Sequence, residues 1–80
     1  MNLEYTPKFN KNFKQFHKII RTKFYKQVGF LIKNLRHPSL RAKKYEESAG
    51  IWQARVDKGV RFYFLIEKDA YVLIDIKYHN

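Results

Sequence analysis

The sequence predicts an α+β fold in which an N-terminal strand and a helical hairpin pack on one face of a small antiparallel β-sheet. Between residues 9 and 35, apolar side chains recur every three or four positions, as on one side of a helix. Between residues 51 and 77 they recur at every second position, as on one face of a strand. With 80 residues, the chain has room for a single domain, 1–80, in the order strand, helix, helix and three strands.

The first elements expected are a short strand at 2–5 and a helix that begins at Thr6-Pro7. Threonine is a good N-cap, and proline is favoured at the first position of a helix. The helix that follows has one apolar stripe with spacings of four, three and four residues. The residues of this stripe are Phe9, Phe13, Phe16 and Ile20.

A second helix is expected from a cap at Thr22 to about Leu35, where Pro38 follows and ends it. One long helix with a kink near Arg21 is the alternative, but two helices bury both apolar stripes. The stripe of the second helix consists of Phe24, Val28, Leu31, Ile32 and Leu35.

Three strands are expected at 51–56, 60–67 and 70–77, and residues 40–48 are expected to be partly extended. Short polar turns at 57–59 and 68–69 separate the strands and predict an antiparallel meander.

Alternation along these strands separates two faces, because successive side chains of a strand point to opposite sides of the sheet. Even positions are expected to pack on the helices and are almost all apolar: Trp52, Ala54, Val56, Val60, Phe62, Phe64, Ile66, Val72, Ile74 and Ile76. Odd positions include Ile51, Leu65 and Leu73 but are otherwise polar or aromatic: Gln53, Arg55, Arg61, Tyr63, Tyr71, Asp75, Lys77 and His79. The odd face is therefore the candidate site for contacts to phosphates and bases.

Charge is the most informative bulk property. Seventeen Lys and Arg residues against seven Asp and Glu residues give a net charge of +10. Such a charge on a small domain attracts a polyanion, with nucleic acid as the first candidate and an acidic protein as the second. A lysine-rich surface without any partner is less favoured, because the charges repel one another.

Several classes of function are disfavoured by composition. The chain has no cysteine, which excludes disulfides, thiolate metal sites and a cysteine nucleophile. Residues 1–10 contain no apolar signal segment, and no apolar run approaches the roughly 18 residues of a membrane span. We therefore expect a cytoplasmic protein with no metal, no cofactor and no membrane partner.

Three segments resemble the RelE/ParE toxin superfamily in sequence, order and spacing. They are the run HPSLRAKK at 37–44, the run IWQARV at 51–56 with Arg61-Phe62, and the run VLIDIKYH at 72–79. The resemblance covers nearly the whole chain and implies a RelE/ParE-like fold.

The resemblance also implies the toxin of a toxin–antitoxin pair, held inactive by an acidic antitoxin, that cleaves mRNA on the ribosome without a metal ion. In such nucleases the ribose 2′-hydroxyl attacks the adjacent phosphate and the 5′-oxygen leaves, which requires a base, an acid and nearby cations. ParE toxins of the same superfamily bind DNA gyrase and cut no RNA. A ParE-like toxin and a non-catalytic basic RNA-binding protein are therefore the alternatives.

Matched position by position, the resemblance implies catalytic roles for four residues. Arg55 and Arg61 would hold the phosphate through bidentate guanidinium contacts. Lys43 would add charge or assist proton transfer. His79 would act as general acid or base, because imidazole can do both near neutral pH. The residues expected to bind RNA or phosphate around them are Arg41, Lys44, Tyr63 and Lys77.

Several nucleases of this superfamily carry a tyrosine close to the C-terminus, whereas here Asn80 follows His79 and Tyr78 precedes it. Tyr63 and Tyr71, on the odd face, are the tyrosines expected to stack a base instead.

Structural roles compete with these functional ones. Arg55 and Arg61 could pair with Asp75 across the strands, since opposite charges on neighbouring strands attract. Trp52 is expected in the core because of its even position. Glu46 is a weaker candidate for the general base.

Overall fold

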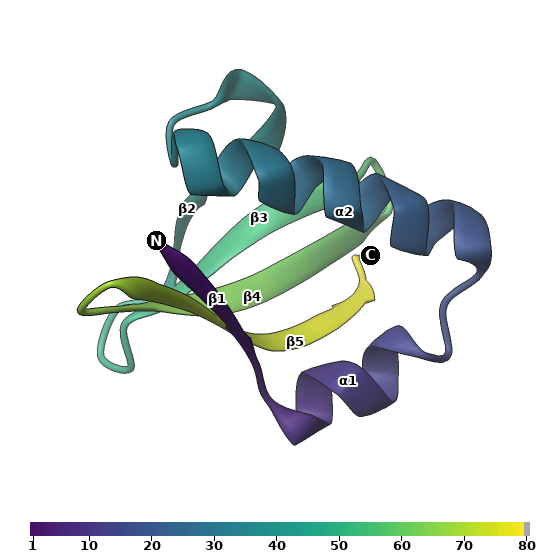
Figure 1. The fold of residues 1–80 in the computed structure, drawn as a ribbon, viewed down its shortest axis with the longest axis horizontal. Coiled ribbons are helices and arrows are strands. Elements are labelled where there is room, and N and C mark those ends of the chain that lie inside the picture. The colour runs from purple at the N-terminus through teal and green to yellow at the C-terminus, as the bar shows by residue number, and fades with distance from the viewer. Residues whose placement is uncertain (80) are drawn as a thin grey trace.

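The computed structural model describes residues 1–79, which form a five-stranded sheet with two helices packed on it (Figure 1). The fold class expected from the sequence is confirmed. The elements are β1 (Asn2–Tyr5), α1 (Pro7–Phe13), α2 (Lys18–Lys33), the 3₁₀ turn η1 (Pro38–Leu40), β2 (Lys43–Glu46), β3 (Ile51–Asp57), β4 (Val60–Glu67) and β5 (Ala70–Tyr78). The strands lie in the order β1-β5-β4-β3-β2.

The sheet is mixed rather than wholly antiparallel. β3, β4 and β5 form the expected antiparallel meander, and β2 pairs antiparallel with β3. β1 pairs in parallel with β5, so the first and last strands of the chain lie side by side. The partly extended segment at 40–48 therefore contributes a strand of its own, and the N-terminal strand occupies one edge of the sheet.

The start of α1 is as predicted. Thr6 is the N-cap, its Oγ1 accepts a hydrogen bond from the Phe9 N–H at 3.1 Å, and Pro7 occupies the first turn. The Thr6 N–H also donates to the Leu73 carbonyl at 3.1 Å, so the helix begins directly at the edge of β5.

The expected boundary between the helices is wrong. α1 ends at Phe13, and α2 begins after His17, whose Nδ1 accepts from the Ile19 N–H at 3.4 Å. Thr22 therefore lies inside α2 and does not cap it. Phe16 is buried in the connection, so the apolar spacing continues through a break in the helix. Within residues 1–79 no helix is long and apolar enough to cross a membrane.

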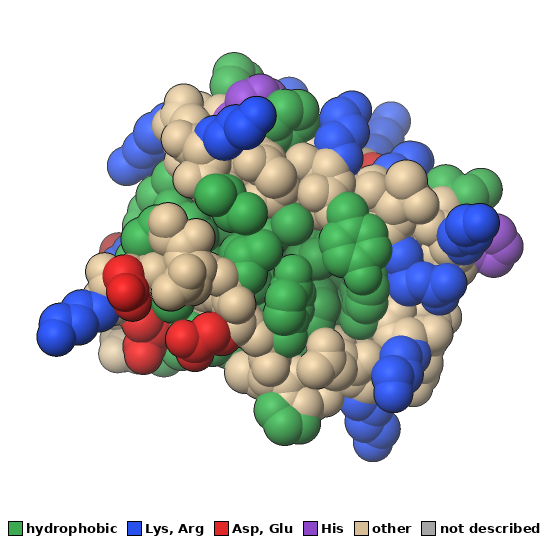
Figure 2. Space-filling view, viewed as in Figure 1, with side chains coloured by type: hydrophobic (Ala, Val, Ile, Leu, Met, Phe, Trp, Pro, Cys, Tyr) green, Lys and Arg blue, Asp and Glu red, His purple; other side chains and the backbone are tan. Residues whose placement is uncertain are grey.

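The core lies between α2 and the sheet, with α1 beside β5 (Figure 1). Its largest fully buried side chains are Phe9, Phe24, Leu31, Leu40, Phe62, Phe64, Leu73 and Ile76. Trp52 is only half-buried and packs against this core from its margin. On the face seen in Figure 2, hydrophobic side chains gather at the centre, Lys and Arg side chains lie around much of the rim, and several Asp and Glu side chains lie at the lower left.

A bulge in β5 changes the alternation that the sequence predicts. Tyr63 pairs with Asp75, but the next residue, Phe64, pairs with Leu73, which leaves Ile74 as the extra residue. An extra residue in one strand exchanges the two faces for all residues beyond it.

The faces predicted for the part of β5 that precedes Asp75 are therefore wrong. Tyr71 and Leu73 are buried in the core, whereas Val72 and Ile74 are half-buried on the opposite face. Tyr71 cannot stack a base from inside the core, so this expectation is wrong. Ile66 of β4 pairs with Tyr71 on the core side, but it is 41% exposed and does not belong to the core as expected.

Candidate nucleic-acid interface

The face of the sheet opposite α2, which we call the open face, carries a pocket of about 300 Å³. We call it the cationic pocket, because five of its six lining residues are basic. The lining residues are Arg41, Lys43, Gln53, Arg55, Arg61 and His79. All four residues that the resemblance marks as catalytic lie in this pocket, which also contains Arg41.

Strand pairing brings these side chains together. Arg55 and Arg61 are direct partners between β3 and β4, and Lys43 and Gln53 are direct partners between β2 and β3. Direct partners point to the same face with Cβ atoms about 5 Å apart. The two guanidinium groups therefore share one side of the sheet, as the alternation in these strands predicts.

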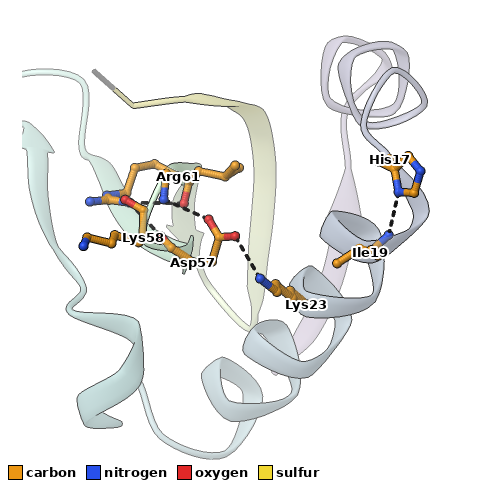
Figure 3. A network of polar contacts seen from close by, with 8 residues as sticks. His17, Ile19, Lys23, Asp57, Lys58 and Arg61 are labelled. Carbon is orange, nitrogen blue, oxygen red and sulfur yellow. Dashed lines mark hydrogen bonds and ion pairs between the residues drawn. The ribbon is translucent and has the colours of Figure 1, made fainter.

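Arg61 is held by the turn between β3 and β4 (Figure 3). Its Nη1 donates to the carbonyls of Asp57 at 2.8 Å and Lys58 at 3.2 Å, and the residue is only 6% exposed. Among residues 1–79 no carboxylate pairs with Arg61, and its other two nitrogens have no hydrogen bond. One edge of the guanidinium is therefore fixed, and the remaining N–H groups can donate to an anion.

Two carboxylates of β3 and β5, those of Asp57 and Asp75, are bound by other residues. Asp57 accepts from Lys23 of α2 at 3.2 Å and from the Gly59 N–H at 2.9 Å. Burial alone would raise the pKa of Asp57, but the hydrogen bonds from Gly59 and Lys23 hold it below its ordinary value.

Asp75 does not pair with Arg55 or Arg61 across the strands, so that structural alternative is wrong. Its carboxylate lies 3.4 Å from Lys8 Nζ and accepts from Asn12 Nδ2 at 2.7 Å. Both donors belong to α1. The positive charge of the cationic pocket is thus not neutralised by a carboxylate of the described residues.

The electrostatics of the pocket reflect this imbalance. Burial, and then the positive charges of Arg41 and Arg61, lower the pKa of Arg55. Arg41 also has a left-handed backbone, with φ of 46°, and no other non-glycine residue of 1–79 has a positive φ. Such a conformation costs roughly 1–2 kcal/mol for an L-residue. Arg41 therefore combines backbone strain with charge repulsion from Arg55. An anion bound between the guanidinium groups would relieve the repulsion.

Two glutamines support the pocket, of which sequence reasoning missed Gln27 and placed Gln53 on the odd face without a role. Gln27 of α2 is buried, and its Nε2 donates to the Arg55 carbonyl at 2.9 Å and the Ser39 carbonyl at 3.1 Å. Gln53 is 7% exposed and lines the pocket itself. The signal for Gln27 is its spacing, because it lies three residues after Phe24 and four before Leu31, on the apolar side of α2.

His79 directly follows β5, and its backbone N–H donates to the Gly59 carbonyl at 2.9 Å. This bond brings its side chain to the pocket beside the β3–β4 turn. Asn80 lies outside the described residues. Within residues 1–79, no three side chains among His, Asp and Glu are arranged to hold a metal ion.

The remaining residues expected to bind RNA divide into two groups. Lys44 does not line the cationic pocket: its Nζ lies 5.4 Å from the Trp52 ring centroid and 3.7 Å from the Glu47 carboxylate. Lys77 is the strand partner of Arg61, and its Nζ lies 4.9 Å from the Tyr63 ring centroid. Tyr63 and Lys77 therefore lie next to the pocket on the open face.

Solved structures of toxins share this fold over nearly the whole chain. YoeB from Staphylococcus aureus, solved as a dimer, is 16% identical, with a TM-score of 0.82 over 100% of this chain and 98% of that one. The same toxin has been solved in complex with YefM. YafQ from E. coli is 19% identical, with a TM-score of 0.80 over 98% and 92% of the two chains. RelE of Methanococcus jannaschii, solved with RelB, is 14% identical, with a TM-score of 0.74 over 94% and 88%.

No protein-family model matches the sequence, and no curated protein matches it either. At identities of 14–19% the likeness is one of fold. The chain has the fold of the YoeB, YafQ and RelE toxins, and the fold that the resemblance implied is confirmed.

Proposed function

We propose that this protein is the toxin of a toxin–antitoxin pair and an endoribonuclease that cleaves mRNA on the ribosome. The observation that carries the proposal is the cationic pocket, in which Arg55, Arg61, Lys43 and His79 converge without a neutralising carboxylate among residues 1–79. The toxin fold of the solved neighbours supports it.

The arrangement fits cleavage by the RNA's own 2′-hydroxyl. A base removes the hydroxyl proton, the 2′-oxygen bonds to phosphorus, and the bond from phosphorus to the 5′-oxygen breaks as an acid protonates that oxygen. The products are a 2′,3′-cyclic phosphate and a free 5′-hydroxyl. Negative charge accumulates on the phosphate oxygens on the way, so donors placed around them accelerate the reaction.

Arg55 and Arg61 are proposed to hold those phosphate oxygens. The turn carbonyls already fix the guanidinium of Arg61, so it needs little reorganisation when charge develops. His79 is proposed to transfer protons, either as base toward the 2′-hydroxyl or as acid toward the 5′-oxygen. Lys43 supplies a further positive charge from the neighbouring strand. No step of this scheme requires a metal ion.

An acidic antitoxin is the proposed protein partner. The net charge of +10 favours association with an acidic segment as well as with RNA. The YoeB and RelE neighbours were solved in complex with YefM and RelB. An acidic segment over the cationic pocket would neutralise its guanidinium groups and exclude RNA at the same time.

The test is inducible expression in bacteria followed by mapping of transcript ends. Expression is expected to arrest growth and to create new mRNA 5′ ends in translated regions. Arg61→Ala and His79→Ala should each lower cleavage by about 100-fold or more, as loss of a transition-state donor or a proton-transfer group does. Circular dichroism of the purified variants verifies that they fold.

A matched pair of lysines provides the control. Lys43→Ala removes a charge inside the pocket and should reduce toxicity, whereas Lys44→Ala removes the adjacent charge outside it and should not. If Arg61→Ala and His79→Ala stay fully toxic, the proposed site is wrong. DNA damage with intact transcripts would instead indicate a gyrase-binding toxin, and harmless expression with salt-sensitive RNA binding a non-catalytic protein.

A further inference from the structure

A second hollow of about 160 Å³ adjoins the cationic pocket on the open face. Tyr63, Ile51 and Ile74 provide its aromatic and apolar surface, and Tyr45, Lys77 and Asp75 also line it. Ile74 reaches this hollow because of the β5 bulge, which moves it away from the core side. The bulge thus gives an otherwise charged region an apolar floor.

Two tyrosines form the aromatic part of the hollow. Tyr63 is only 5% exposed, whereas Tyr45 of β2 is 53% exposed, and their ring centroids lie 4.8 Å apart with an interplanar angle of 64°. Packing against Tyr63 therefore supports Tyr45 from beneath while leaving much of it accessible. Burial, and then the proximity of Tyr45, raise the pKa of Tyr63, so its phenol stays protonated and can donate a hydrogen bond.

Lys77 connects the hollow to the cationic pocket. Its Nζ lies 4.9 Å from the Tyr63 ring centroid and 5.9 Å from that of Tyr45, so the ammonium group is held beside both rings. Lys77 is also the strand partner of Arg61. Arg61 and Tyr63 are two residues apart on one strand, which separates them by about 7 Å on the same face.

We propose that Tyr45, Tyr63 and Lys77 form a subsite that stacks the base of a nucleotide whose phosphate is held by Arg55 and Arg61. The inference rests on the proposed function, because it takes RNA as the ligand of the pocket. A nucleotide carries a flat aromatic base one ribose away from its phosphate. The open face presents matching groups in the same order. The guanidinium groups of Arg55 and Arg61 come first, then the ammonium group of Lys77, and then the accessible Tyr45 ring beside apolar side chains. Base stacking on such a ring tolerates any of the four bases.

The experiment uses a single-stranded RNA of twelve nucleotides and mixed sequence in which every ribose is 2′-O-methylated, so that it cannot be cleaved. A second probe has abasic residues in place of the central nucleotides. Affinities are measured by fluorescence anisotropy at one salt concentration. The wild-type protein should bind the intact probe about tenfold more tightly than the abasic one, the usual size of one stacked base.

Three variants identify the ring responsible. Tyr45→Leu should abolish the difference between the two probes, and Tyr45→Phe should retain it because the phenyl ring still stacks. Tyr25→Leu is the matched control: Tyr25 is 58% exposed on α2 and should behave as the wild type. Equal affinity of the wild type for both probes, no measurable binding, or an unchanged difference in Tyr45→Leu would each overturn the subsite.

The two proposals fail separately. If Tyr45→Leu loses the preference for the intact probe but transcripts in cells remain uncut, the subsite stands and the nuclease proposal is wrong. If transcripts are cut but the preference survives in Tyr45→Leu, the nuclease stands and the subsite is wrong.

Discussion

The two faces of β4 both carry buried side chains, but different kinds of contact surround the side chains on each face. Phe62 and Phe64 point toward α2, are fully buried and contact other apolar side chains. Arg61 and Tyr63 point to the open face, opposite α2, and are almost as inaccessible, at 6% and 5% exposed. Turn carbonyls and a neighbouring tyrosine shield them instead.

This contrast shows how one strand serves stability and binding at once. On the helix side, burial removes apolar surface from water, which stabilises the fold. On the open side, burial orients a guanidinium group and leaves like charges close together, which does not stabilise the free protein. Substitutions on the two faces should therefore affect different measurements.

The largest effect on stability is expected on the helix side. Phe62→Ala should lower the free energy of unfolding by about 3–5 kcal/mol, because it deletes a fully buried ring and leaves a cavity. Urea denaturation of the purified protein measures the loss. A cost below about 1 kcal/mol would contradict the division between the faces.

A smaller loss is expected from the residue that links the faces. Gln27→Leu should cost about 1–3 kcal/mol, because the carbonyls of Arg55 and Ser39 lose the donor that the buried Gln27 side chain provides. It should also weaken RNA binding, since Gln27 holds β3 and the segment that leads to Arg41. Gln15→Leu, at an exposed position, is the control and should change stability by no more than about 0.5 kcal/mol.

The ion pair between α2 and the β3–β4 turn predicts a dependence on pH. The pKa of Asp57 in the folded protein lies below its ordinary value of 3.8, so the unfolded chain binds its proton first as the pH falls. The contribution of Asp57 to stability is therefore complete above that value and is lost as the pH falls through the lowered pKa. Asp57→Asn should flatten the stability profile in this acidic range and leave its shape near neutral pH unchanged, as thermal denaturation at successive pH values would reveal.

The smallest effect on stability is expected on the open face. Arg55→Gln should leave the Tm unchanged or raise it slightly, because it removes one of three neighbouring positive charges. The same variant should bind RNA more weakly, with a slope of log affinity against log salt that is smaller by about one. A clear fall in Tm without a change in slope would assign Arg55 to the fold rather than to binding.

Much of this architecture could be predicted from local patterns. The cap at Thr6 and the alternation from Val60 to Phe64 in β4 depend on neighbouring residues, and both predictions are confirmed. The common face of Arg55 and Arg61 follows from the same alternation, because polar and apolar residues differ clearly along β3 and β4.

Prediction failed where neighbouring residues are all apolar, because the pattern of polar and apolar residues then gives no information. Val72, Leu73 and Ile74 are all apolar, so their order gives no indication of which face each side chain occupies. The spacing of phenylalanines continues from α1 through Phe16, so it could not indicate where the helix ends. The position of Lys44 against Trp52, outside the cationic pocket, was likewise not predictable from a run of two lysines.

Hydrophobic periodicity and charge, which are properties of short segments, determined the class of fold, the central strands and the basic character of one face. The tertiary structure decided the rest, because β1 joins the far edge of the sheet in parallel and the β5 bulge depends on register across two strands. The same register places Ile74 beside Tyr45 and Tyr63 and brings five basic side chains together around the cationic pocket. Contacts between residues distant in the chain are set by the packing of the whole molecule, and no local pattern encodes them.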